Sequence, residues 1–436
     1  MKINMHSDLS EAKGSTCRCE TSRRIMTRVG ADMRFYFPAI LLLCSVLNAS
    51  ETMTLTGRIL DATTLEPIPY VNIYIKGAEI GSASNFDGYF LFKCPAEYRQ
   101  DTLVVSHVGY QSFLSTPSEM PLNMNSIHLH PQPIELPEIM AVTGRSIVEK
   151  AISCLDSNIN PDPYLMTGFY REIIRDKTAL NKYAEGVIHI HRAGGSNDEL
   201  KLLKGRKRAN LAAFAVHKKA DPTLGGPIGC FYKDIQTYNK EFFTETSLDF
   251  YNYFMEGLTT LENKPVYIIR FDRRPDAKGG IYRGRLYVDQ TTLAIVLVQY
   301  EYNKFGLMKA QPDIVQRNLA KFFAGLTFET IGFSATVSYF MYDGRWYIKS
   351  IHYEIIDKVT RKGIEYVYTT EKELLITDLQ LSHVEAFQKS ELLDPKKEFV
   401  DQLGEYDEDF WENHTILQAT ENQKQLINAL HMDPSK

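Results

Sequence analysis

Cysteine and tryptophan are scarce in this chain of 436 residues, which has six cysteines and two tryptophans. Half of the cysteines lie in the first fifty residues and half beyond them: Cys17, Cys19 and Cys44, then Cys94, Cys154 and Cys230. The last three are widely spaced, so they permit at most one disulfide and lack the close pairs of a zinc site. A disulfide-stapled scaffold is thereby excluded, and we expect buried thiols instead.

The chain also lacks the short motifs of common catalytic sites. It has no Gly-x-Ser-x-Gly, no His-Glu-x-x-His and no Gly-Lys dipeptide from which a phosphate-binding loop is built. These absences count against hydrolases and NTPases. With 44% hydrophobic and 24% charged residues, the composition is that of a folded protein, and the length allows two or three domains.

The apolar run at residues 35–47 is about 13 residues long, too short for the roughly 20 residues of a membrane-spanning helix. With the small residues that follow it, this run predicts a secretory signal peptide at 33–50 that begins at Met33. Residues 1–32 match no structural pattern, and we interpret them as a non-native upstream extension. An alternative is lipidation at Cys44, although Leu43 stands where lipoprotein signals carry a small residue.

Without residues 1–50, 42 basic and 50 acidic residues remain, an excess of eight negative charges. Such a balance disfavours a general nucleic-acid binder. Export predicts a place in the periplasm or at the outer membrane of a Gram-negative-type cell. The partner we expect there is an envelope protein, a glycan or a lipid.

Short runs of alternating apolar residues fill the segment 53–130. They begin at Met53, Val71 and Leu103, and turn residues bound each run, as in half-buried antiparallel strands. Asp87 and Gly88 predict a tight hairpin ahead of the strand at 89–92. The pattern predicts a small, Greek-key-like β-sandwich.

Four ordered blocks in this segment resemble the carboxypeptidase-regulatory-like (transthyretin-like) domain family. They are TGRI at 56–59, EPIPYVNI at 66–73, GSASNFDGYF at 81–90 and SHVGY at 106–110. Asn85 stands where the family usually has Asp, but either side chain can close a local turn. The resemblance implies a sandwich that accompanies other domains and has no chemistry of its own.

Metallocarboxypeptidases carry a His-x-x-Glu zinc pair, and none of the eleven histidines here has Glu three residues later. We therefore assign no catalytic, cofactor-binding or metal-binding residue and expect no cofactor. The rival hypothesis is an envelope hydrolase whose catalytic groups come from distant positions.

Three prolines between 131 and 137 favour extended backbone, which predicts a linker at 131–143. Beyond it, Ser146 and Glu149 have the spacing of a capping box, so an amphipathic helix should begin near Ser146 and end around Asn158 to Pro163.

The region 144–420 is rich in strand patterns and should form an α+β domain, followed by a tail at 421–436. Two long hairpins, turning at 289–292 and at Asp343-Gly344, favour one curved antiparallel sheet. The run 284–296 resembles, more weakly, the half-barrel wall of lipoprotein-carrier-like domains, which encloses an apolar cavity. The alternatives are another curved sheet packed on helices and a small outer-membrane barrel. Charges on the strands count against the barrel: Arg283, Arg285, Lys349 and Glu354.

Two histidine pairs have the spacing of neighbours on one strand face: His189 with His191 and His128 with His130. Such pairs can start a metal site, but no third ligand has motif spacing, so a polar sheet face is the simpler interpretation. His107 shares a strand face with Leu103 and Val105, so we expect a hydrogen-bonded, structural histidine there.

A basic cluster lies at KLLKGRKR, residues 201–208, followed by Lys218 and Lys219. It could bind lipid phosphates or acidic glycans, but a solvated loop is the commoner outcome. In the acidic stretch 406–412, Phe410 and Trp411 predict a terminal segment anchored on the core. The sequence therefore predicts a mainly β, non-enzymatic envelope protein whose strand-rich domain binds a partner or an apolar ligand.

Overall fold

The computed structural model describes residues 52–121, 125–132, 143–176, 180–193, 198–209, 226–237, 242–312, 325–361, 363–404 and 407–431. All of them belong to one compact unit, Ser50–Lys436. The upstream extension, the signal peptide with Cys44, most of the linker, Lys218 and Lys219 lie outside the described residues. The domain boundaries within Ser50–Lys436 stay predictions. Within the described ranges, no helix has both the length and the apolar character needed to span a membrane.

The β-sandwich expected at residues 53–130 is confirmed. One sheet has the order β4-β1-β7 and the other β3-β2-β5-β6. The strands are β1 Thr52–Asp61, β2 Asn72–Ile75, β3 Gly81–Ala83, β4 Tyr89–Pro95, β5 Leu103–Ser106, β6 Phe113–Ser115 and β7 Asn125–Leu129, and a 3-10 turn, η1 Ala96–Tyr98, follows β4. Their alternating apolar side chains, among them Leu55, Ile73 and Phe90, form a core of their own. Contrary to the expectation of antiparallel pairing throughout, β1 pairs with β7 in parallel.

The hairpin expected at Asp87-Gly88 is wrong, because β3 and β4 belong to different sheets. The turn instead carries the chain from one layer to the other. Asn85 closes it as expected, since its Oδ1 accepts from the backbone N–H groups of Asp87 (3.0 Å) and Tyr89 (2.9 Å). Gly88 has φ +80°, and a Cβ there would lie 2.5 Å from the Ile59 carbonyl oxygen, so the turn requires glycine.

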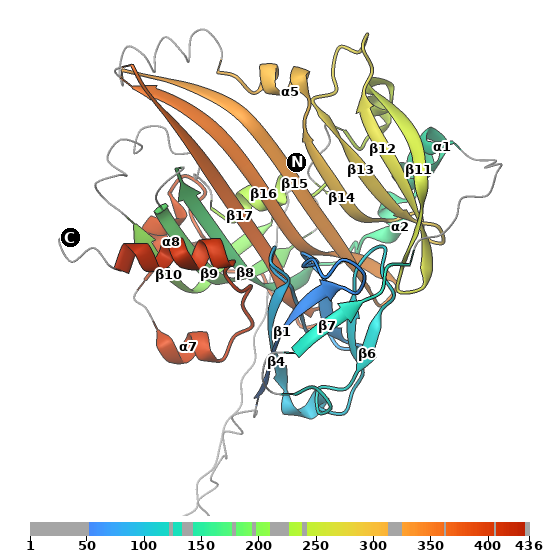
Figure 1. Ribbon diagram of the computed structural model, residues 1–436, viewed down its shortest axis with the longest axis vertical. Helices are drawn as coiled ribbons and strands as arrows, with labels where there is room; N and C mark the ends of the chain where they lie inside the picture. The colour runs from blue at the N-terminus through green and yellow to red at the C-terminus, as the bar shows by residue number, and fades with distance from the viewer. Residues whose placement is uncertain are drawn as a thin grey trace, which may run out of the picture. The chain divides into compact units, whose positions relative to one another are not determined.

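The second sheet has ten strands in the order β10-β9-β8-β17-β16-β15-β14-β13-β12-β11, and Figure 1 shows its long strands β15, β16 and β17 side by side. The strands are β8 Tyr164–Arg175, β9 Leu180–Arg192, β10 Glu199–Ala209, β11 Tyr251–Leu261, β12 Lys264–Arg273, β13 Tyr282–Asp289, β14 Ile295–Tyr302, β15 Leu326–Tyr342, β16 Arg345–Arg361 and β17 Ile364–Gln380. All pairings are antiparallel, and the sheet is open, with β10 and β11 at its edges. Asp343 and Gly344, both at positive φ, turn β15 into β16 as predicted.

Helices and short segments cover one face of this sheet. They include α1 Gly144–Ser153, α2 Leu155–Asn158, α4 Ile228–Phe231, η2 Glu245–Phe250, α5 Lys304–Lys309 and η4 Phe399–Gln402. Phe242 stacks on Phe271 (ring centroids 5.2 Å apart) and contacts Tyr282 and Tyr300. The chain's own aromatic side chains therefore pack against the wall on which the weaker resemblance implied an apolar cavity.

The capping box expected at Ser146 and Glu149 is wrong. The N-cap is Thr143, whose side chain and that of Ser146 exchange hydrogen bonds with each other's backbone N–H, so α1 begins two residues earlier. Glu149 pairs instead with Arg145 at 2.8 Å.

The C-terminal segment crosses the opposite face of the sheet. It contains η3 Lys389–Glu391, α7 Glu408–Glu412 and α8 Glu421–His431. Trp411 is buried among Phe169, Val187 and Leu375, with Phe410 beside it, so the predicted anchor is confirmed.

Candidate functional site

A cavity of about 220 Å³ lies where the sandwich meets the ten-stranded sheet. The sandwich supplies residues before and at the start of β2, among them Tyr70 and Asn72, and residues at the end of β5, among them His107. The sheet contributes strands β11 to β16. Its apolar lining residues are Leu261, Val296, Leu297, Phe340, Met341 and Trp346.

The position of the cavity on the sheet follows from strand alternation. Gln299, Thr336 and Ser338 line it, while the intervening Val298 and Val337 point into the core on the helical face. The cavity therefore lies on the sheet face that meets the sandwich, not on the face that the half-barrel resemblance implied.

Tyr70 holds an unusual backbone conformation in the cavity wall. Its φ is +57°, which is uncommon for a bulky residue. Ser84 fixes this turn, because its main-chain oxygen accepts from the Tyr70 N–H (3.1 Å) and its hydroxyl bonds both the Val71 N–H and the Ile68 oxygen (2.9 Å each). Backbone strain of this kind concentrates at binding and catalytic sites.

Three buried polar atoms in the wall have no hydrogen-bond partner among the described residues. They are the Tyr70 hydroxyl, Asn72 Oδ1 and Trp346 Nε1. Trp346 itself is only 5% exposed. All three atoms are fully buried, so they lie behind the surface of the cavity rather than on it.

Lys349 is the most unusual group of the cavity. It is the extra residue of a β-bulge in β16, since Ser338 pairs with Ser350 and Tyr339 with Ile348. Its Nζ donates to the Ile376 oxygen at 2.9 Å, and among the described residues no carboxylate lies within 4 Å of it. Burial lowers the pKa of Lys349 to about 7.

The acids and the histidine of the cavity are engaged within the fold. Glu262 accepts from the Tyr74 hydroxyl (2.7 Å) and from Ser106 (3.2 Å). Asp289 Oδ1 accepts three hydrogen bonds from residues 291 and 292 of its turn. His107 lies 2.8 Å from the Val108 oxygen through Nδ1, and burial lowers its pKa to about 4.

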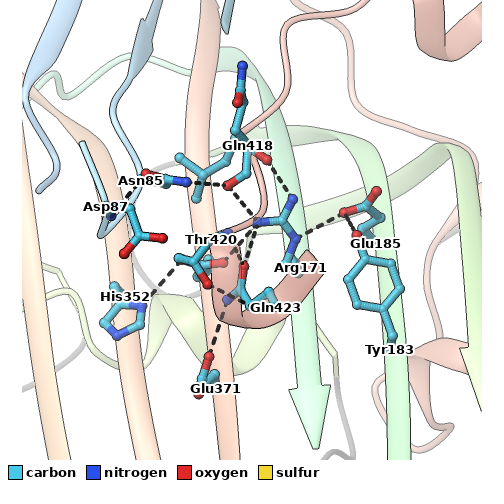
Figure 2. Close-up of polar contacts among 12 residues, drawn as sticks. Asn85, Asp87, Arg171, Tyr183, Glu185, His352, Glu371, Gln418, Thr420 and Gln423 are labelled. Carbon is cyan, nitrogen blue, oxygen red and sulfur yellow. Dashed lines mark hydrogen bonds and ion pairs between the residues drawn. The ribbon is translucent and has the colours of Figure 1, made fainter. Parts of the chain in front are cut away.

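A buried ionic network adjoins this site on the same sheet face (Figure 2). Arg171 of β8, 1% exposed, donates to Glu185 of β9 (3.0 Å) and Glu373 of β17 (3.2 Å). The Tyr183 hydroxyl and Arg206 also bond Glu185. These strands are buried on both faces, so the ions lie in a protein interior.

Arg171 also fastens the C-terminal segment to the sheet. Its guanidinium donates to the main-chain oxygens of Leu417 (2.5 Å) and Gln418 (3.3 Å). The Gln418 oxygen also accepts from Asn85 Nδ2 of the sandwich (3.2 Å), as Figure 2 shows. The Glu421 N–H donates to Asp87 (2.7 Å). Residues 417–421 thus join the sandwich to the sheet.

His352 connects this network to the cavity. Its ring lies 5.3 Å from that of Tyr70, and its Nδ1 is 3.7 Å from the Glu373 carboxylate. Although the ring is buried, Glu373, Glu371 and Glu354 raise the pKa of His352 above its usual value.

The histidine pairs of the sequence behave as sheet residues. His189 and His191 share a face of β9 beside Phe387, and His128 and His130 are exposed around the end of β7. No group of three metal-binding side chains converges within the described part of the chain.

The interpretation of residues 201–208 as a solvated loop is wrong, because they lie in strand β10. Three of their lysines contact the C-terminal segment. Lys201 pairs with Glu391, Lys204 with Asp407 (2.9 Å), and Lys207 donates to the Val400 oxygen (2.7 Å). The acids that pair with this strand come from residues far along the chain, so local sequence patterns do not reveal them.

Arg171 was not predicted as a site residue, and Lys349 was considered only as a charge unsuited to a lipid-facing strand. The sequences of both strands contain a pattern that could have identified these residues. Each cation interrupts an apolar run, FYREII at 169–174 and WYIKSI at 346–351. A lone cation within a strand buried on both faces is a candidate for a specific buried contact.

Comparison with known proteins identifies the sandwich. Residues 55–140 match the CarboxypepD_reg-like domain. This non-catalytic regulatory domain includes Tyr70, Asn72 and His107 of the cavity wall, and the predicted resemblance is confirmed. No curated protein matches the chain.

Two solved structures share weak likeness with the chain. A DUF1329 family protein from Desulfovibrio piger is 12% identical, with a TM-score of 0.25 over 58% of this chain and all of that protein. A structure of lipovitellin, described for its lipid–protein interactions, is 12% identical with a TM-score of 0.22, over 53% of this chain and 26% of lipovitellin. At these scores neither relates the sheet to a known fold.

Proposed function

We propose that this chain is an exported, non-catalytic envelope protein that holds a small, partly apolar ligand between its regulatory-like sandwich and its ten-stranded sheet. The observation that carries the proposal is the cavity of about 220 Å³, which both parts build. Its wall combines apolar side chains with a few polar ones, among them Asn72, Gln299 and Lys349. Ligand sites are commonly concave, largely apolar and equipped with a few polar groups, and they often lie between domains.

The size of the cavity limits the ligand. An apolar cavity of about 150 Å³ can hold benzene. A volume of about 220 Å³ suits one ring with a small polar substituent, or a short chain. The site is thus suited to a small molecule rather than to a long lipid.

Binding is favoured over catalysis by the engagement of the polar groups. Glu262 and Asp289 accept hydrogen bonds from their own neighbourhood, and His107 is bonded to Val108. None of the three forms a pair with another that could act as acid and base. Export rests on the signal-like run at 35–47, and the location is the periplasm or the outer membrane.

Saturation-transfer NMR with benzyl alcohol tests this function on the purified exported protein. Ser338→Phe fills the cavity, whereas Ser334→Phe adds the same ring four residues earlier on the same face of β15, outside the cavity. We expect transfer to benzyl alcohol with the wild type and Ser334→Phe, and its loss with Ser338→Phe. Equal transfer in all three proteins, or none in any, would contradict the proposal.

A further inference from the structure

Lys349 is buried at the cavity, and its burial lowers the stability of the protein unless an anion pairs with it. The residue is 6% exposed, yet its only described hydrogen bond is to the neutral oxygen of Ile376. The centroid of the Phe340 ring lies 5.7 Å from Nζ. An ammonium group held in this environment is costly without an anion.

The charged groups around the cavity do not supply that anion. From the sandwich the cavity receives His107, and from β11 to β13 it receives Glu262, Lys264 and Asp289. The two acids are engaged elsewhere, and Lys264 lies at an exposed position. On β16 and β17, His352 and Glu373 pair with each other. Within the described residues, no acid forms an ion pair with Lys349.

Lys349 itself can supply further hydrogen bonds to a ligand. A protonated Lys349 has two N–H groups beyond its bond to Ile376, and the residue lines the cavity. Such a group is complementary to a ligand with an acidic oxygen.

We propose that the ligand of this cavity is a small carboxylic acid whose carboxylate forms an ion pair with Lys349. This inference rests on the proposed function and specifies the chemical class of its ligand. The apolar walls hold the ring or chain, and Lys349, at its β-bulge, holds the acid group. Because Lys349 is largely neutral above pH 7 in the empty protein, binding there takes up a proton.

Benzoate and benzyl alcohol differ in the charge of one small group. Comparing them distinguishes binding in the cavity from recognition of a carboxylate. Their affinities are measured for the wild type, for Lys349→Met and for the control Lys150→Met, which removes an exposed cation of helix α1 outside the cavity. We expect the wild type and Lys150→Met to prefer benzoate by roughly tenfold to a hundredfold, the strength of a charge-assisted hydrogen bond. Lys349→Met should lose that preference and still bind benzyl alcohol.

Calorimetry at pH 8 in two buffers of different ionisation enthalpy adds an independent measure. The wild type should take up close to one proton on binding benzoate, and Lys349→Met none. If Lys349→Met keeps the preference, or the wild type binds benzyl alcohol equally well, the carboxylate claim is overturned while the binding function stands. If neither ligand binds the wild type, the proposed function fails as well.

Discussion

The guanidinium of Arg171 lies 2.5 Å from the main-chain oxygen of Leu417, so a residue of strand β8 holds a segment almost 250 positions later in the chain. The same guanidinium neutralises two buried carboxylates, those of Glu185 and Glu373. The Arg171 network therefore joins strand β8 to the C-terminal segment, which also bonds the sandwich.

Arg171→Met should destabilise the protein by about 3–5 kcal/mol, because it leaves Glu373 and Glu185 buried with fewer counter-ions. Urea denaturation measures the change in the free energy of unfolding. The matched control is Arg145→Met, which removes an exposed pair with Glu149 and should cost less than about 1 kcal/mol. Similar losses of unfolding free energy in both variants would contradict the stabilising role of the network.

Lys349→Met should make the protein more stable near neutral pH, by about 1–4 kcal/mol. Burial lowers the pKa of Lys349 to about 7, against roughly 10.4 in an unfolded chain. Between those values the unfolded chain binds the extra proton, so wild-type stability should rise from pH 7 to pH 10. The variant should lack that rise, whereas Lys264→Met should keep it. Unfolding free energies at pH 7, 8.5 and 10 decide between these outcomes.

Export predicts that the mature protein begins between about Ser50 and Thr52. N-terminal sequencing of the protein from the cell envelope measures this directly. An intact Met1 in that fraction would remove the signal-peptide claim. A start at Cys44 would instead support the lipoprotein alternative.

Limited proteolysis should cut first between about Pro131 and Ala141, where the prolines predict a linker. Mass spectrometry of the first fragments identifies the site. The sandwich strands from Val71 to Phe92 should resist, because their backbone is paired and their apolar side chains are buried. An early cut there would mean that the sandwich is less stable than its packing indicates.

Local patterns were enough to predict several strands of both parts. Alternation around Leu55 and Ile73, and the Asp343-Gly344 turn, depend on neighbours along the chain. Pairing between strands is not local, which is why Asp87-Gly88 was expected to form a hairpin although its flanking strands belong to different sheets. Thr143 was missed as the cap because Gly144, a poor helix former, follows it; Gly144 is favoured there because a Cβ would lie 2.9 Å from the Tyr253 oxygen.

The candidate site was beyond prediction for the same reason. Tyr70 and Lys349 line one cavity from positions that no local pattern relates. Asp407, which pairs with Lys204, and Leu417, which accepts from Arg171, both lie more than 200 residues later in the chain. Sequence alone could show that a cation interrupts an apolar strand, but not which distant group faces it.

Fluorescence of Trp346 tests ligand binding at the cavity most directly. The chain has only two tryptophans, so Trp411→Phe leaves the indole of the cavity wall as the sole reporter. Titration with benzoate should change its emission saturably in this background and in the background that also carries Ser334→Phe, and should leave it unchanged with Ser338→Phe. An emission that does not respond to benzoate, or that responds equally in all three proteins, would contradict the account.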